Sequence, residues 1–413
     1  MASKYSMHTH TCGELRRSNI GTEVTLTGWV WHRRDHGGLI FVDLRDRAGV
    51  TQISFDPEHS GGTAFHTAEQ IRLEWPILVH GVVRERPEGM ANDKLATGEI
   101  EVLVSAIEVL NSSKTPPFQI EDHVGASEDV RLRYRYLDLR RPHMMANLQL
   151  RSDFTHAIRE ALHKRSFMEV ETPSLFKSTP EGARDFLVPS RTQPGHFYAL
   201  PQSPQLLKQL LMIGGVERYY QIAKCFRDED LRADRQPEFT QVDIEMSFVK
   251  QDDVMGALEA VLHDAFAALG VEMKLPLRRI SYWDAMDTYG IDKPDTRFGM
   301  HLHDVTSIFA GSKFKLFAGA AATEGQYVKA LNAKGAGSWP RAQIDKLADV
   351  AATFGAKGLA WIAFRPDGSM NSPIVKFFSD EELAALKVEM EVEPGDLVMF
   401  SVADRLHADE ILG

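Results

Sequence analysis

The residues best suited to chemistry form one charged stretch over 226–241, which reads FRDEDLRADRQPEFTQ. It places Arg227, Arg232 and Arg235 among five acidic residues. The residues before it are β-prone and those after it alternate polar and apolar, which predicts a long hairpin with an eleven-residue loop. Arginine can hold a phosphate bidentately, and a nearby ring can stack on a base. On the pattern alone, a surface hairpin with a solvated charge run explains the stretch equally well.

The second strand of this hairpin has two different faces. One face is polar, and because unpaired polar groups are costly to bury, we expect it to line a wet cavity. This polar face consists of Phe239, Gln241, Asp243 and Glu245. The opposite face is expected to belong to the core and consists of Thr240, Val242, Ile244 and Met246.

The whole stretch resembles motif 2 of class II aminoacyl-tRNA synthetases, in the form found in bacterial-type aspartyl-tRNA synthetases. The resemblance implies that Arg227 holds the α-phosphate of ATP and the substrate carboxylate. It also implies that Glu229 and Gln236 contact the nucleotide, with Phe239 stacked on adenine. The implied reaction joins L-aspartate to tRNA through an aspartyl-adenylate, with ATP as substrate and Mg²⁺ bridging its phosphates.

A second group of candidate residues precedes the hairpin. Turn formers and charges over 177–189 predict a mobile loop that carries Glu181. Pro204 opens an apolar-periodic run, which predicts a helix start with Ser203 as its cap.

Within that helix, Gln205 and Lys208 lie three residues apart and share one face. An exposed lysine on an amphipathic helix is the favoured explanation of Lys208 when the sequence is taken alone. The resemblance implies instead that Gln205 and Lys208 recognise the aspartate side chain and that Glu181 contacts its ammonium group. Asp243 is a further candidate for the ammonium group.

Two helices are predicted from apolar periodicity. The first has a stripe from Leu150 to Leu162 and ends before SFMEVETP, and together they resemble motif 1, which implies a homodimer. The second covers 253–269, with Asp252 or Asp253 as its cap and Gly270 as its stop.

Residues 1–110 contain five short β-prone runs separated by glycine, proline and charged turns, which predicts an OB-type β-barrel. Such barrels bind single-stranded nucleic acid through exposed aromatic rings and polar side chains. The segment GWVWHRRDHGGLIFVDLRDRAGVTQISF resembles the anticodon-binding domain of the same family. The implied anticodon-binding residues are Arg33, Arg34, His36, Phe41 and Gln52.

Some of these residues also have simpler explanations. A phenylalanine in a β-run such as Phe41 usually belongs to the core, and His36 is explained as a solvated turn residue. A histidine at this turn is similar to the enzymes that charge both tRNA(Asp) and tRNA(Asn), and Gly89 agrees with that broader specificity.

The segment RLRYRYLDLRR over 131–141 interleaves arginines with Tyr134 and Tyr136. Two interpretations remain open, an RNA backbone contact or pairing with acidic neighbours at a domain junction, and the second is favoured.

The bulk composition is that of a globular protein, with 43% hydrophobic residues, 25% charged residues and a net charge of −11. The negative charge argues against indiscriminate nucleic-acid binding. Only Cys12 and Cys225 are present, which predicts reduced thiols in a cytoplasmic protein. The sequence has no signal-peptide h-region and no apolar run of membrane-spanning length, so no membrane partner is expected.

The predicted fold class is α+β multidomain. It combines the OB-type barrel at 1–110, a linker or hinge at 111–140, an antiparallel-sheet class II catalytic domain at 141–285 and an α/β insertion domain at 286–413. We find no third class II motif in the sequence, so the catalytic domain is expected to be incomplete. The alternatives to an aspartate–tRNA ligase are a catalytically incomplete tRNA-binding fragment or paralogue and a related class II enzyme for asparagine or lysine.

Overall fold

The computed structural model describes residues 7–413, which divide into two compact units at Leu275/Pro276. The sequence places a boundary at 285/286, whereas this division assigns helix α7 (Tyr282–Tyr289) to the second unit, on which it packs. Among the described residues no helix is both long and apolar enough to cross a membrane. Cys12 and Cys225 are both free and buried.

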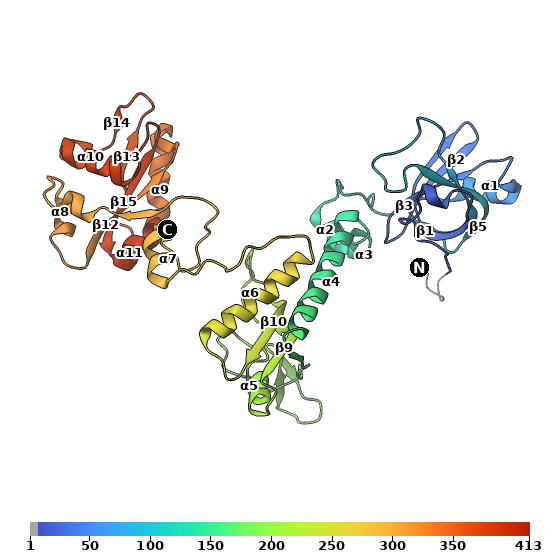
Figure 1. Cartoon of the computed structure of the whole chain (residues 1–413), viewed down its shortest axis with the longest axis horizontal. Helices are drawn as coiled ribbons and strands as arrows, with labels where there is room; N and C mark the ends of the chain where they lie inside the picture. The colour runs from blue at the N-terminus through green and yellow to red at the C-terminus, as the bar shows by residue number, and fades with distance from the viewer. Residues whose placement is uncertain (1–6) are drawn as a thin grey trace. The chain divides into compact units, whose positions relative to one another are not determined.

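The first unit begins with a closed five-stranded barrel (Figure 1) in the order β1-β2-β3-β5-β4. The strands are β1 (Glu23–His36), β2 (Leu39–Arg45), β3 (Val50–Phe55), β4 (Pro76–Glu85) and β5 (Ile100–Val109), with α1 (Gly61–Gln70) between β3 and β4. The five predicted strands are confirmed. They form because alternate residues, such as Val24, Leu26 and Val30, point into one apolar core.

The segment after the barrel contains two short helices, α2 (Glu128–Arg133) and α3 (Arg135–Asp138). Buried Asp138 accepts hydrogen bonds from Arg135 and Arg141. Arg140 donates to buried Glu74 of the barrel at 3.0 Å. These arginines therefore pair with acidic neighbours at a junction, as the favoured interpretation predicts.

The rest of the first unit is a small sheet in the order β10-β9-β6, covered by two helices. Its elements are α4 (Pro142–His163), β6 (Met168–Glu169), β7 (Leu187–Pro189), β8 (Phe197–Ala199), α5 (Gln205–Ile213), β9 (Arg218–Phe226), β10 (Glu238–Met246) and α6 (Gln251–Ala267). Helices α4 and α6 pack against Tyr220 and Ile244 of the sheet.

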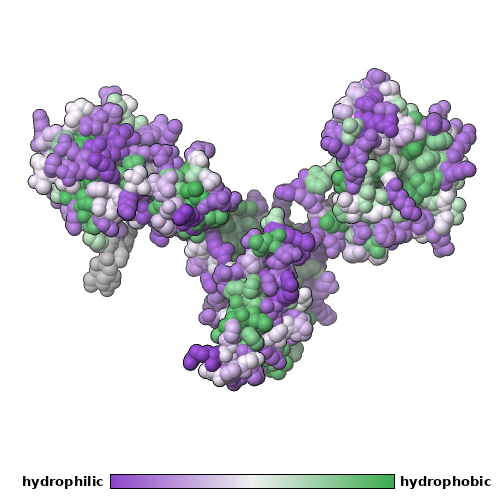
Figure 2. Space-filling view, turned by 180° about the vertical axis from the view of Figure 1, so that it is seen from behind, coloured by the Kyte–Doolittle hydropathy of each residue, from purple (hydrophilic) through white to green (hydrophobic). Residues whose placement is uncertain are grey.

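Several sequence expectations for this part are wrong. Val242 was assigned to the apolar core face of its strand but is 43% exposed. Leu150, in the apolar stripe that resembles motif 1, is 52% exposed. Ser203 does not cap α5, since its hydroxyl donates to Glu181 instead. The N-cap of α6 is Lys250, and Asp253 caps it from inside the first turn by accepting from the Lys250 backbone. Figure 2 shows hydrophobic side chains reaching the surface between hydrophilic ones.

The second unit is built on a five-stranded antiparallel sheet in the order β11-β12-β15-β13-β14. Its strands are β11 (Leu302–Asp304), β12 (Gln326–Ala333), β13 (Ala360–Phe364), β14 (Met370–Asn371) and β15 (Leu397–Asp404). Its helices are α7, α8 (Lys315–Ala321), α9 (Arg341–Thr353), α10 (Asp380–Glu389) and α11 (Arg405–Leu412). Apolar clusters around Phe317 and around Ile344 bury residues of this sheet.

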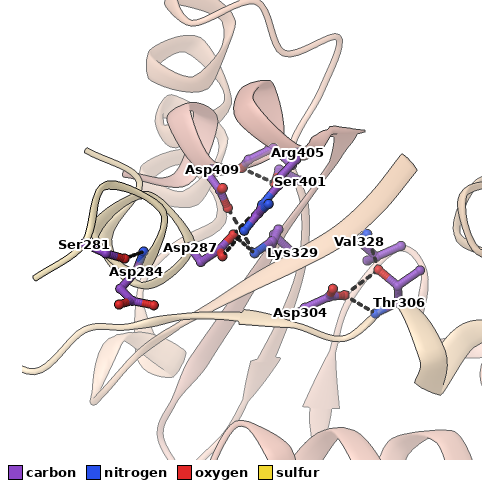
Figure 3. A network of polar contacts seen from close by, with 11 residues as sticks. Ser281, Asp284, Asp287, Asp304, Thr306, Val328, Lys329, Ser401, Arg405 and Asp409 are labelled. Carbon is purple, nitrogen blue, oxygen red and sulfur yellow. Dashed lines mark hydrogen bonds and ion pairs between the residues drawn. The ribbon is translucent and has the colours of Figure 1, made fainter. Parts of the chain in front are cut away.

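A buried ion cluster joins three elements of the second unit (Figure 3). Lys329 of β12 lies 3.2 Å from carboxylate oxygens of both Asp287 on α7 and Asp409 on α11. Arg405 donates to Asp287 at 3.0 Å, also from α11. The first and last helices of this unit are therefore held together by charge as well as by packing.

Candidate active site and candidate nucleic-acid face

The hairpin of β9 and β10 sets the geometry of the candidate site. Cys225 pairs with Phe239 and Gln221 with Asp243 in the antiparallel register. The charged loop between the strands is closed at its base, where the Arg227 backbone N–H donates to the Pro237 carbonyl at 2.9 Å. Arg227 thus leaves the end of β9 beside the polar face of β10, as predicted.

Arg227 has its guanidinium against an aromatic ring. Its Cζ lies 5.0 Å from the centre of the Phe239 ring, a cation–π distance. Its Nε is buried and has no hydrogen-bond partner among the described residues. A buried charged donor without a partner is costly, so the arrangement is typical of a site that receives an anion.

Lys208 is buried and not solvated. Its ammonium donates to Asp243 at 2.7 Å and lies 3.4 Å from Glu245. The exposed-lysine explanation is therefore wrong. Burial raises the pKa of Asp243, with Glu245 and Glu181 adding to the effect, while Lys208 opposes it. Lys208 is therefore a buried cation in contact with two carboxylates, Asp243 and Glu245.

Glu181 is held in place from two sides. It accepts from Thr179 at 2.9 Å and from Ser203 at 2.7 Å, and with these residues it lines a small cavity. Its charge acts on Asp243, which shows that the loop side chain and the strand side chain share one electrostatic environment.

The remaining predicted site residues are less buried than Lys208 and Asp243. Gln205 is half-buried at the first position of α5, one turn before Lys208. Glu229 accepts from Arg235 at 3.3 Å within the charged loop. Gln236 is exposed near the end of that loop, directly before Pro237, whose carbonyl accepts from the Arg227 backbone.

Two residues of the site were missed by sequence reasoning. Gln202 is 2% exposed and holds the loop that carries Glu181. Cys225 is buried under the hairpin with its Sγ 3.2 Å from Gln241, and burial together with Asp243 raises its pKa to about 11. A thiol in that state is inert at neutral pH, so Cys225 acts as a packing residue. Neither residue has a sequence signal, because their partners are distant along the chain.

The candidate nucleic-acid face lies on the outside of the barrel. Ile40 and Val42 point into the core, while Phe41 between them is half-buried on the outer side, so the core explanation of Phe41 is wrong. The His36 ring lies 6.1 Å from the Phe41 ring. Arg34 pairs across the strands with Phe41.

Polar contacts hold the other predicted residues of this face. Arg34 donates to Asp43 at 2.9 Å, and Gln52 donates to Glu101 at 2.7 Å. Arg33 bonds the Ala68 carbonyl at 2.9 Å and so belongs to a different set of contacts from Arg34. Arg34, His36, Phe41 and Gln52 therefore form one outer patch from which Arg33 is separate.

The chain belongs to the class II tRNA synthetases. The family described as "tRNA synthetases class II (D, K and N)" matches residues 127–393, and "OB-fold nucleic acid binding domain" matches residues 24–110.

Two curated relatives are particularly similar. The chain is 56% identical to the "Aspartate--tRNA(Asp/Asn) ligase" of Desulfatibacillum aliphaticivorans and 57% identical to the protein of that name from Moorella thermoacetica. Both comparisons cover 96% of this chain but only 66% and 65% of the respective relatives, so the chain spans about two thirds of their length.

Solved structures agree on the fold. The asparaginyl-tRNA synthetase of Pyrococcus horikoshii, solved with asparaginyl-adenylate, has a TM-score of 0.57 and 27% identity. The match covers 64% of this chain and 58% of that one. A putative aspartyl-tRNA synthetase from Leishmania major Friedlin has a TM-score of 0.56 at 24% identity, covering 65% and 54%, and supports the fold.

Proposed function

We propose that this chain binds L-aspartate and ATP and serves their condensation to aspartyl-adenylate, followed by transfer to tRNA. The observation that carries the proposal is the buried Lys208, whose ammonium group donates to Asp243 at 2.7 Å. A buried ammonium group suits the side-chain carboxylate of aspartate and would repel lysine. The curated relatives named as aspartate–tRNA ligases support the same substrate.

The three acidic residues around Lys208 have a complementary role. Glu181 and Asp243 offer carboxylates to the ammonium group of the substrate, while Gln205 lies one helical turn from Lys208. Aspartate would thus exchange Asp243 for its own carboxylate at Lys208. Asp243 would in turn pair with the ammonium group of the substrate, so that its buried carboxylate keeps a cation.

ATP would lie along the hairpin. Arg227 neutralises charge on the α-phosphate as the aspartate carboxylate attacks, and Phe239 stacks on adenine. Glu229 and Gln236 would contact the nucleotide from the charged loop. Positioning and electrostatics suffice for this step, and no protein nucleophile is needed.

Mg²⁺ would arrive with ATP. Within residues 7–413 no group of three or more acidic, histidine or cysteine side chains could hold a metal ion, so we assign no step to it.

The outer patch of the barrel would bind the anticodon. Phe41 offers a ring for stacking and Gln52 an amide for a base edge. His36 beside Phe41 would tolerate more than one base, which favours both tRNA(Asp) and tRNA(Asn) as partners. Arg33 and Arg34 would supply positive charge near the backbone. We also propose that the protein forms a homodimer and acts in the cytoplasm.

Aspartate-dependent ATP–pyrophosphate exchange by the 413-residue chain is the direct test, with asparagine and lysine as competing amino acids. Exchange with aspartate alone supports the proposal. Failure to exchange with aspartate, or a preference for asparagine or lysine, contradicts it.

A tRNA-binding role without amino-acid activation is the second candidate, because the chain spans only about two thirds of its relatives. Filter binding of tRNA(Asp) and tRNA(Asn), run beside the exchange assay, distinguishes the two. Binding without exchange supports the second candidate, and exchange refutes it.

A further inference from the structure

Gln202 is the most buried polar residue of the loop between β8 and α5. Its side-chain amide makes two bonds to one residue of the 177–189 loop. It accepts from the Ala183 N–H at 3.1 Å and donates to the Ala183 carbonyl at 2.8 Å. This two-point contact imitates a strand pairing and fixes the loop backbone rather than one flexible side chain.

The same amide reaches the side chain of Asp185 at 2.5 Å, which also accepts from Ser178 at 2.5 Å. The loop is therefore tied together on both sides of Glu181. Glu181 is in turn held by Ser203, the immediate neighbour of Gln202. The orientation of Glu181 consequently depends on contacts that converge on Gln202.

The loop also contacts the charged loop of the hairpin. The Asp228 N–H donates to the Arg184 carbonyl at 3.0 Å, and the Arg184 side chain donates to the Asp228 carbonyl at 3.3 Å. Arg184 lies directly after the residue that Gln202 holds, and Asp228 directly after Arg227. Hydrogen bonds alternating with steps between chain neighbours thus connect Glu181 with the arginine of the nucleotide side.

We propose that Gln202 is a positioning residue that couples amino-acid binding to nucleotide binding. It holds Ala183 so that the loop docks on Asp228, and each ligand then orders the loop that the other ligand needs. Such coupling is reciprocal between the two ligands. This inference rests on the proposed function, because it takes Glu181 as a contact of the amino acid and Arg227 as a contact of ATP.

The sharpest variant is Gln202→Glu, which keeps the size of the side chain but cannot donate to the Ala183 carbonyl and repels Asp185. Gln209→Glu is the matched control, because Gln209 is exposed on α5. Ala183→Pro is a second variant that leaves the buried residue intact and removes the N–H that Gln202 accepts.

Two measurements on the 413-residue chain test the inference. Hydrogen exchange of the unliganded protein reports whether the 177–189 loop is held. Calorimetric titration of L-aspartate, with and without a non-hydrolysable ATP analogue, gives the coupling factor. We expect a factor of about five or more in the wild type and in Gln209→Glu.

In Gln202→Glu and in Ala183→Pro we expect that factor to fall to about one and loop exchange to become roughly tenfold faster. Nucleotide affinity measured without aspartate should change little. Unchanged loop exchange in both variants, or an unchanged coupling factor, overturns the inference. Failure of the wild type to bind aspartate overturns the proposed function instead, while loop exchange still tests whether Gln202 holds the loop.

Discussion

Arg227 combines a ring on one side with a buried Nε that has no partner among the described residues. The ring therefore already orients the guanidinium before any ligand arrives, and an anion would supply the partner that Nε lacks. This preorganisation distinguishes Arg227 from Arg232 on the same loop, which is exposed.

Arg227→Ala is expected to lower aspartate-dependent pyrophosphate exchange by roughly a hundredfold or more, because a preorganised charge at the reacting phosphate is lost. Binding of tRNA should be unchanged, since the barrel lies elsewhere in the sequence. Arg232→Ala is the control and should retain near-normal exchange. Near-normal exchange in Arg227→Ala would remove it from the site.

The sequence predicted which residue types the site needs but not how they are held. Arg227, Phe239 and Asp243 follow from a strand whose polar face cannot be buried unpaired, and the structure brings them to one face as expected. The role of Gln202 could not be predicted from the sequence, because its main partner is the backbone of a residue 19 positions away. Nearly every residue type offers the same backbone N–H and carbonyl, so the identity of Ala183 does not reveal that its backbone bonds Gln202.

At the scale of elements, the cluster around Lys329 holds α7 and α11 on the sheet of the second unit (Figure 3). Gly290 at the end of α7 has a positive φ of 71°, and a Cβ there would lie 2.3 Å from the Asp409 carbonyl. The close approach of the Gly290 and Asp409 backbones and the ion pairs of Lys329 therefore both join α7 to α11.

Lys329→Met is expected to destabilise the second unit by about 3–5 kcal/mol, because two carboxylates lose the buried cation between them. Hydrogen exchange of β12 and β15 amides measures the loss within that unit. Lys346→Met on α9 is the control, since Lys346 is exposed. Equal protection in the two variants would refute a structural role for the cluster.

Asp409 gives the cluster a pH dependence of definite sign. Burial raises the pKa of Asp409 despite Lys329, so the folded state keeps a proton that the unfolded state has lost. The free energy of unfolding of the wild type therefore falls as pH rises through the window above the ordinary aspartate pKa. Asp287 acts in the opposite direction, because its hydrogen bond from Arg405 lowers its pKa.

Asp409→Asn removes the Asp409 contribution and should be more stable than the wild type at about pH 8 and equally stable at about pH 3. Urea unfolding across this range, followed by exchange of the same β12 and β15 amides, measures the difference. A difference between the two proteins that does not vary with pH would contradict the assignment.

The helices and strands themselves were predicted better than the burial and the contacts of their residues. The five barrel strands follow from alternation, because a closed barrel gives every strand one buried face. Leu150 and Val242 have the periodicity of buried residues but remain exposed, since periodicity defines a face and not the element that covers it. The prediction that Ser203 caps α5 is wrong because the Ser203 hydroxyl donates to Glu181 instead.

At the scale of the whole molecule, the candidate functions lie in separate parts of the sequence. The outer patch around Phe41 belongs to the barrel, and the contacts of Lys208 belong to the segment that follows it. A change in the first should therefore leave amino-acid activation intact.

Phe41→Leu is expected to weaken tRNA binding by about 1–3 kcal/mol, the contribution of one ring stacked on a base. Aspartate-dependent exchange and thermal stability should be unchanged, because Phe41 points away from the barrel core. Phe55→Leu, inside the core, is the contrasting variant and should lower stability. Undiminished tRNA affinity in Phe41→Leu would exclude the stacking role.

The barrel and the three-stranded sheet of the first unit differ in how they end. The barrel closes on itself, whereas β10 lies at an edge of its sheet and exposes Val242. An open edge with an exposed apolar residue is a template for pairing between molecules, so self-association on heating or concentration is expected to involve the hairpin segment. Val242→Lys would place a charge there, on the opposite side of the strand from Asp243, and so improve solubility at little cost to the pocket.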